Sequence, residues 1–256
     1  MTPELEAMQR LIAIIEELRQ KCPWDRVQTF DTLRHLTIEE VFELSDTIVD
    51  QRPDEMKKEL GDIIMHIVFY ASIARERGLF TLADVINGVC DKLVFRHPHI
   101  YGENANNANP PQWEKIKMAE GRKSVLGGVP KALPSLIKAY RMVEKTSGIG
   151  FRWENPQQAF AKVEEECREV QEELQKTEAQ QNTEEEVGDL LFALAAWAQT
   201  VGINPDTALE KANRKFETRF KDVERQAAEQ GTPLSEMTTE QLAALWKNAK
   251  NNTQNH

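Results

Sequence analysis

Two pairs of acidic residues in the second half of this chain have the spacing of a metal site. Glu166 and Glu169 are three residues apart, as are Glu186 and Asp189. Residues with this spacing lie on one face of a helix, and two antiparallel helices can bring the four carboxylates together. Anions at close range repel one another unless cations neutralise them. Hard oxygen ligands select Mg²⁺, with Mn²⁺ as an alternative, so the spacing predicts a magnesium site.

Solvated helix faces are the ordinary explanation of glutamate-rich sequence, but the second acidic pair argues against it. Asp189 is followed directly by Leu190, Leu191 and Phe192 and so belongs to an apolar helix. Burial of a carboxylate in a helix that packs into the hydrophobic core costs free energy unless the carboxylate has a hydrogen-bond or charge partner. The first half of the chain carries a second candidate cluster of the same residue types, namely Glu40, Glu43, Glu59 and Asp62.

The two halves of the chain repeat one unit. Glu39–Glu43 matches Glu165–Glu169 at an offset of 126 (166 − 40). Glu59–Asp62 matches Glu186–Asp189 at an offset of 127 (188 − 61), and a one-residue loop insertion explains the difference. Because the matches follow one another in the same order, the sequence predicts a duplication.

Helical periodicity runs along the whole chain, whereas strand-like alternation is nearly absent. The sequence therefore predicts an all-α protein of two tandem four-helix-type units. We expect an N-terminal unit at 1–100, a linker at 101–132 rich in Pro, Gly and Asn with one short helix near 113–120, and a C-terminal unit at 133–256. The expected helices cover about 3–21, 36–50, 53–78, 81–95, 133–147, 156–178, 183–201, 205–230 and 238–250.

Composition bounds the class of protein. The formal charge of −10 disfavours binding to DNA or RNA. No apolar run is long enough to cross a membrane, and no secretory signal precedes the first helix. Three widely spaced cysteines predict neither a disulfide framework nor a zinc site, so a cytoplasmic protein is expected.

Other chemistries fit the residues less well. A di-iron carboxylate bundle requires Glu-x-x-His pairs, and none of the five histidines has a glutamate three residues before it. His97 and His99 flank a proline in a linker, with no third metal ligand nearby in sequence. Cys22 and Cys167 are expected to pack rather than to act as nucleophiles.

The combination of Glu-Glu-x-x-Glu (165–169) with Glu-x-x-Asp (186–189) resembles the signature of the MazG family of all-α nucleotide pyrophosphohydrolases. Cys22-Pro23-Trp24-Asp25, Arg96-His97-Pro98-His99 and the tandem arrangement are similar to the full-length bacterial type. The resemblance implies hydrolysis of nucleoside triphosphates to a monophosphate and pyrophosphate, with magnesium. It also implies a homodimer of interlocked helical units, broad nucleotide tolerance and a house-cleaning role.

On this resemblance, Glu166, Glu169, Glu186 and Asp189 hold the metal, and Glu165 orients or deprotonates the attacking water. Lys215 and Arg219 lie four residues apart, hence on one helix face, and suit phosphate oxygens. The remaining candidate substrate-binding residues are Lys162, one turn before Glu166, Asn213 for sugar or base, and Trp246, which stacks on the base or packs in a core or dimer interface.

The first half departs from this pattern one turn after its last acid. His66 stands where the second half has Ala193, and its imidazole would crowd the acidic face or add a fifth polar group. The resemblance also implies that the C-terminal unit is the active one, so we expect the first half to be degenerate or structural. Two alternatives stay open, namely a non-catalytic helical scaffold that binds nucleotide or protein, and a phosphohydrolase for nucleoside diphosphates or sugar nucleotides.

Overall fold

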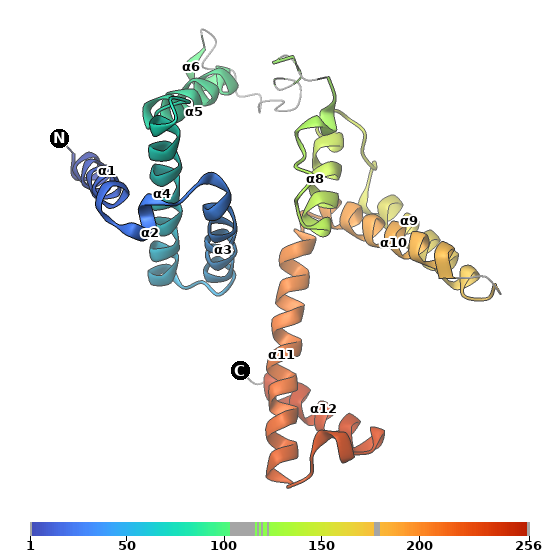
Figure 1. Cartoon of the computed structure of the whole chain (residues 1–256). Helices are drawn as coiled ribbons and strands as arrows, with labels where there is room; N and C mark the ends of the chain where they lie inside the picture. The colour runs from blue at the N-terminus through green and yellow to red at the C-terminus, as the bar shows by residue number, and fades with distance from the viewer. Residues whose placement is uncertain are drawn as a thin grey trace. The chain divides into compact units, whose positions relative to one another are not determined.

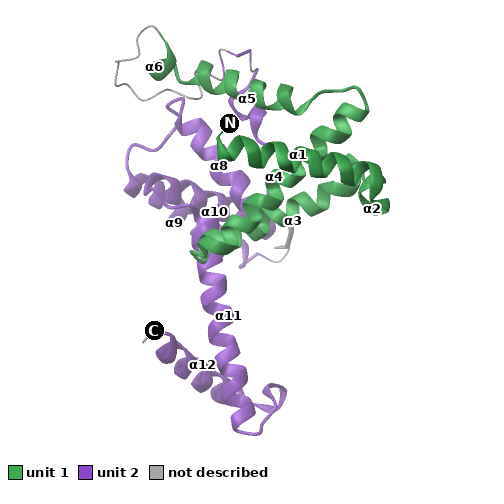
Figure 2. Cartoon of the chain, turned by 90° about the vertical axis from the view of Figure 1, so that its left-hand side faces the viewer, with its two compact units in different colours: residues 1–111 green, residues 112–256 purple. Residues whose placement is uncertain are grey.

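The computed structural model describes residues 2–102, 116, 118, 120–121, 123–176 and 180–254. These residues form helices joined by turns, with no strand among them, which confirms the all-α prediction. The chain divides into two compact units, residues 1–111 and 112–256 (Figures 1 and 2). Each unit contains one copy of the acidic motif. Within the described part of the chain, no helix is both long and apolar enough to span a membrane.

Unit 1 is built around one long helix, α4, which packs against α1, α3 and α5 (Figure 1). Proline stands at the first position of α4, where its missing N–H costs no hydrogen bond. The helices of unit 1 are α1 (Pro3–Lys21), α2 (Pro23–Arg26), α3 (Phe30–Val49), α4 (Pro53–Glu76), α5 (Leu82–Arg96) and α6 (Pro98–Tyr101).

The start of α3 corrects the sequence prediction, which placed it near residue 36. Thr29 caps the helix, because its side chain accepts a hydrogen bond from the Thr32 backbone N–H at 3.2 Å. The Thr32 hydroxyl oxygen in turn accepts from the Thr29 N–H at 2.8 Å, which completes a capping box. Asn155, 126 residues after Thr29, caps α9 by accepting a hydrogen bond from the Gln158 backbone N–H at 2.9 Å, so the repeat extends to the position of the helix cap.

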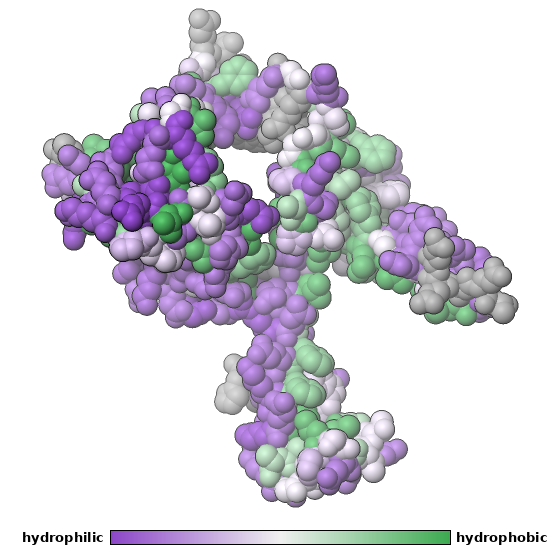
Figure 3. Space-filling model, viewed as in Figure 1, coloured by the Kyte–Doolittle hydropathy of each residue, from purple (hydrophilic) through white to green (hydrophobic). Residues whose placement is uncertain are grey.

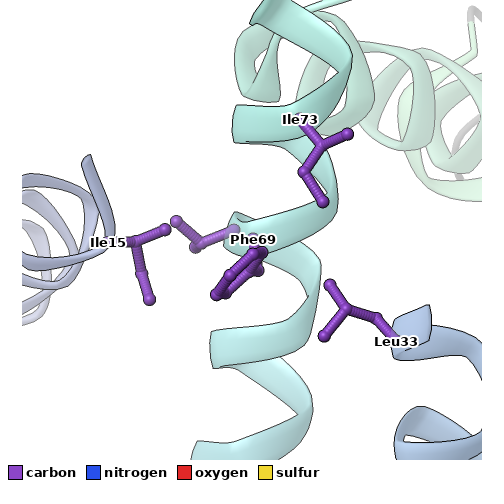
Figure 4. Packing of buried hydrophobic residues seen from close by; sticks show 5 residues of the cluster. Ile15, Leu33, Phe69 and Ile73 are labelled. Atoms are coloured by element: carbon purple, nitrogen blue, oxygen red, sulfur yellow. The ribbon is translucent and has the colours of Figure 1, made fainter. Parts of the chain in front are cut away.

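Five buried side chains form the core of unit 1 where α1, α3 and α4 meet (Figure 4). Burial of each large apolar side chain contributes roughly 1.5–3 kcal/mol. The core residues come from three helices whose apolar faces point inward, and they are Ile15, Leu33, Val68, Phe69 and Ile73.

Arg19 holds the break between α1 and α3 in place. Its guanidinium donates to the Asp25 carbonyl at 2.6 Å, to the Gln28 carbonyl at 3.1 Å and to Glu76 Oε1 at 2.9 Å. One buried side chain therefore satisfies carbonyls at the end of α2 and ties them to α4. The Cys22–Asp25 segment thus has a structural role, because it follows the end of α1 and presents the Asp25 carbonyl to Arg19.

Unit 2 holds the second copy of the motif, on helices α9 and α10. Helix α10 packs against α9 and α8, and α12 packs against the long helix α11. The short helix expected near 113–120 lies largely outside the described residues, and α9 ends at Glu173, before the expected 178. The elements are η1 (Val125–Gly128), α8 (Ser135–Ser147), α9 (Pro156–Glu173), α10 (Gln180–Thr200), α11 (Pro205–Glu229), η2 (Leu234–Glu236) and α12 (Thr239–Gln254).

Candidate functional site

Helix α9 places one glutamate of its motif inside the protein and the glutamate before it on the surface. Ala159, Val163 and Glu166 are buried on the same face of this helix, as their spacing of three or four residues requires. The Glu166 side chain is only 6% exposed, whereas that of its neighbour Glu165 is 48% exposed. Glu166 therefore belongs to the face that packs on α10, and Glu165 faces solvent.

The carboxylates of α9 and α10 converge. One carboxylate oxygen from each of Glu166, Glu186 and Asp189 lies within 4.8 Å of the other two. Glu169 shares a hydrogen bond with Glu166, and its pKa is raised by partial burial and by the proximity of Glu166 and Glu186. The structure thus brings together the oxygens of three of the four predicted metal ligands, and the fourth, Glu169, interacts with Glu166 beside them.

Lys162 lies beside this cluster. Its ammonium nitrogen is 2.7 Å from an oxygen of Glu165 and 2.7 Å from an oxygen of Glu166. The hydrogen bonds to Glu165 and Glu166 raise the pKa of Lys162, and the same contact lowers the pKa of Glu165. The ionised Glu165 carboxylate and the Lys162 cation are therefore held together at the edge of the acidic cluster.

A cavity of about 740 Å³ opens beside the carboxylates in unit 2. Helix α10 lines it from Asp189 to Thr200, and a rise of about 1.5 Å per residue makes this stretch roughly 16 Å long. The rings of Phe160 and Trp197 lie 5.4 Å apart, which shows that the early part of α9 packs beside the late part of α10. Acidic residues therefore line one end of the cavity, and Gln199 and Thr200 the other.

The segment between α8 and α9 contributes aromatic groups to the same cavity. Phe151, Arg152 and Trp153 line it, just after Gly150, whose φ of 97° is a left-handed conformation that favours glycine. Sequence reasoning missed these residues as site members. The signal was present, since Trp24 and Trp153 precede matching helices in the two repeats.

Four predicted substrate-binding residues lie elsewhere in the chain, on α11 and α12. Arg219 donates from Nε to the Thr253 hydroxyl at 2.9 Å, and Lys215 lines a separate cavity of about 610 Å³. Trp246 packs against Phe216, with ring centroids 5.2 Å apart. Of the residues the structure places around the acidic cavity, none comes from these helices. The roles of Lys215, Arg219, Trp246 and the exposed Asn213 stay predictions.

Unit 1 carries the matching acidic cluster. Oxygens of Glu40, Glu43 and Glu59 lie within 4.8 Å of one another. The pKa of Glu40 is raised by partial burial and then by repulsion from Asp62 and its other acidic neighbours. Two acidic clusters of this kind are found among the described residues, one in each repeat.

His66 lies one turn beyond Asp62 and is buried. Its Nδ1 is 2.6 Å from the hydroxyl of Thr37, which is itself 2.7 Å from the Tyr70 hydroxyl. Burial lowers the pKa of His66, so the neutral imidazole fits this buried hydrogen-bond chain. The side chain fills the interior of unit 1 at the position where unit 2 has the small Ala193.

Comparison with known proteins bears on the whole chain. The model of the MazG nucleotide pyrophosphohydrolase domain matches residues 28–101 and again residues 154–224. A nucleoside triphosphate pyrophosphohydrolase/pyrophosphatase MazG of Thermotoga maritima is 41% identical over 94% of this chain and 95% of its own length. Nucleoside triphosphate pyrophosphohydrolases of Escherichia coli K12 and Mycobacterium tuberculosis are 37% and 33% identical, over 96% and 58% of this chain and over 98% and 48% of their own lengths.

Proposed function

The chain belongs to the MazG nucleotide pyrophosphohydrolase family, and we propose on this basis that it hydrolyses nucleoside triphosphates to a nucleoside monophosphate and pyrophosphate. The observation that carries the proposal is the convergence of Glu166, Glu186 and Asp189 at one end of the unit 2 cavity. The proposed role is to clear nucleotides from the cytoplasmic pool with broad tolerance of the base. Unit 2 is proposed as the active unit.

The donor set fits a hard divalent cation. The three converging groups are all carboxylates, and their oxygens lie within 4.8 Å of one another. Mg²⁺ and Mn²⁺ favour such oxygen ligands, whereas zinc sites favour nitrogen and sulfur. Glu166, Glu169, Glu186 and Asp189 would hold the ion. When bound, it would neutralise the anionic cluster and stabilise the negative charge that develops on the phosphates.

The residues beside the cluster have distinct proposed roles. The Lys162 ammonium lines the cavity and can donate hydrogen bonds to phosphate oxygens as a point charge. Glu165 is exposed and ionised, so its carboxylate can accept a hydrogen bond from the attacking water. Because Lys162 lowers the pKa of Glu165, this carboxylate is a weak base, and we assign it to the orientation of the water rather than to removal of its proton.

Unit 1 lacks part of this machinery. Leu36 in unit 1 stands at the position that matches Lys162 in unit 2, at the offset of 126. His66 in unit 1 stands at the position that matches Ala193, at the offset of 127. The first repeat therefore keeps the carboxylates but has a leucine at the position that matches Lys162, and its interior is filled by His66. This difference supports the assignment of hydrolysis to unit 2.

We also propose that two copies of the chain form a dimer through an apolar stripe. Leu60, Ile64 and Ile67 on α4 are exposed, and so are the matching Val187, Leu191 and Leu194 on α10. Figure 3 shows hydrophobic surface over the α8–α10 part of unit 2 and along α11. Large apolar patches mark interfaces, and exposure at the same register in both repeats favours pairing of like surfaces. Sedimentation of a species twice the monomer mass would support the dimer, and a monomer at micromolar concentration would contradict it.

Pyrophosphate release from a panel of nucleoside triphosphates tests the reaction. We expect monophosphate and pyrophosphate in the presence of Mg²⁺ and no turnover after addition of EDTA. The panel would also rank the bases. Failure to hydrolyse any triphosphate, or release of a single phosphate, would instead favour a non-catalytic scaffold or a different phosphorylated substrate.

A further inference from the structure

A small cavity of about 330 Å³ lies in unit 1, lined by residues of α1, α2 and α4. Every described side chain that lines it is polar or charged. Ser72 follows Asp62 by ten residues on α4, or about 15 Å of helix, so the cavity is separate from the acidic cluster of unit 1. The charged lining residues and the buried serine are Glu16, Arg19, Arg26, Ser72, Arg75 and Glu76.

Positive charge is in excess in this cavity, although the chain as a whole is acidic. Three arginines and two glutamates line it, which leaves a formal charge of +1 (3 − 2). Arg75 donates from Nη1 to Glu16 Oε1 at 2.5 Å, and Arg19 donates from Nε to Glu76 Oε1 at 2.9 Å. The third arginine, Arg26, forms no ion pair with the residues that the structure describes. Its guanidinium is therefore available to an anion.

The hydroxyl of Ser72 is a second, independent sign of a ligand. Ser72 is only 7% exposed, and its Oγ is buried without a hydrogen-bond partner in the described part of the chain. A serine within a helix often donates to the carbonyl four residues earlier, but Ser72 does not. Because an unsatisfied buried hydroxyl destabilises a protein, a ligand that accepts a hydrogen bond from Ser72 would remove this cost.

The lining selects the class of ligand. Sites for organic molecules are mostly apolar and range from about 300 to 1,000 Å³, whereas this cavity is at the small end of that range and has a wholly polar lining. It offers no aromatic or aliphatic surface on which a base could stack. Guanidinium groups bind the oxygens of phosphate in pairs, and a serine hydroxyl can donate to a further oxygen. A small inorganic anion fits these features better than a nucleotide does.

We propose that this cavity binds a small inorganic oxyanion of the phosphate class, held by Arg26, Arg75 and the hydroxyl of Ser72. The bound anion links α2 to α4, because Arg26 belongs to α2 and the other two residues belong to α4. Gln199 and Gly202 stand in unit 2 at the positions that match Ser72 and Arg75, at the offset of 127. The site is therefore particular to unit 1 and gives this unit a ligand that is separate from the hydrolysis assigned to unit 2.

Calorimetric titration of the full chain with orthophosphate and with pyrophosphate, in EDTA and at constant ionic strength, tests the proposal. EDTA removes the cation through which the unit 2 carboxylates would hold a phosphate. We expect Arg26→Gln to weaken binding of both anions by at least about tenfold, since charge-assisted hydrogen bonds are lost. Arg10→Gln, at an exposed position of α1 outside the cavity, should change binding by less than about twofold, because salt screens its charge.

Two outcomes of this titration would overturn the proposal, namely no binding of either anion by the wild type and equal affinity in the wild type and Arg26→Gln. Acetate and a nucleoside monophosphate are the comparison ligands. Tighter binding of acetate than of orthophosphate would overturn the phosphate class. Tighter binding of the monophosphate than of orthophosphate, with the same dependence on Arg26, would overturn the inorganic assignment.

Ser72→Ala tests the buried hydroxyl without adding volume to the cavity. We expect this variant to be at least as stable as the wild type in buffer without phosphate, because it loses an unsatisfied donor. Its affinity for orthophosphate should fall by at least about threefold, since one hydrogen bond to the anion is lost. Unchanged affinity would overturn the assignment of Ser72 to the site. None of these titrations involves hydrolysis, so they are independent of the reaction assigned to unit 2.

Discussion

Lys162 joins a solvent-exposed glutamate to a buried one, because its ammonium lies 2.7 Å from an oxygen of Glu165 and 2.7 Å from an oxygen of Glu166. The same side chain lines the cavity proposed for the substrate. Replacement by methionine keeps the aliphatic stem and removes the charge. We expect Lys162→Met to lower kcat/KM by about 10- to 100-fold, since charge-assisted contacts to phosphate are lost. Steady-state kinetics measures this, and Lys138→Met on α8 is a control. An unchanged kcat/KM would remove Lys162 from the substrate site.

Binding of Mn²⁺ separates the two acidic clusters. Glu186 in unit 2 and Glu59 in unit 1 occupy matching positions at the offset of 127. We expect Glu186→Gln to weaken Mn²⁺ binding to unit 2 by at least about tenfold, because one carboxylate ligand becomes a neutral amide. Titration calorimetry without nucleotide reports this directly. Glu59→Gln is the matched control and should leave this Mn²⁺ binding unchanged. Loss of the same binding in Glu59→Gln would assign the metal site to unit 1.

The unit 1 core should be intolerant of truncation. Phe69 is 3% exposed within the cluster of Figure 4, and Phe69→Ala removes a whole ring from close-packed surroundings. We expect a loss of about 3–5 kcal/mol in the free energy of unfolding of unit 1. Urea denaturation followed by far-UV circular dichroism measures the loss. Leu79→Ala, at a side chain that is exposed, should change it by less than about 0.5 kcal/mol.

The ion pair of Arg19 and Glu76 should make the stability of unit 1 depend on pH. The hydrogen bond from Arg19 lowers the pKa of Glu76 in the folded state. A carboxyl with a lowered folded pKa contributes stability above its unfolded pKa, and this contribution is lost as the pH falls through the folded value. The wild type should therefore exceed Glu76→Gln in stability at neutral pH by under about 1 kcal/mol, since Glu76 is 43% exposed.

The difference in stability between these two proteins should begin to shrink near pH 4.5, the ordinary pKa of a glutamate, and should disappear once the pH has fallen through the lowered folded pKa of Glu76. Chemical denaturation of both proteins across this range tests the sign. A difference that grows on acidification would show that the pair does not act through an ionised Glu76.

Sequence alone predicted the parts of the site that depend on spacing. Glu166 and Glu169 share a helix face, as do Glu186 and Asp189, and an antiparallel hairpin then brings the pairs together. The start of α3 was predicted wrongly because its cap depends on side-chain hydrogen bonds between Thr29 and Thr32 rather than on apolar periodicity.

The cavity could not be predicted from the sequence pattern, for a different reason. It depends on the small size of Ala159 and Ala196 relative to Leu33 and Phe69, and on the packing of α8 against α10. An alanine on a helix carries no signal of a void until its neighbours are placed in space. Trp153 precedes the first acidic helix of its repeat, as Trp24 does in the other repeat, but only the structure places Trp153 in the cavity lining.

The most direct test of the central claim compares two aspartates at matching positions, Asp189 in unit 2 and Asp62 in unit 1. Pyrophosphate release from a nucleoside triphosphate with Mg²⁺ is measured for Asp189→Asn and Asp62→Asn, with folding checked by circular dichroism. The account predicts that Asp189→Asn lowers kcat by at least about 100-fold and that Asp62→Asn keeps most of the activity. Full activity of Asp189→Asn, or loss of activity in Asp62→Asn alone, would contradict it.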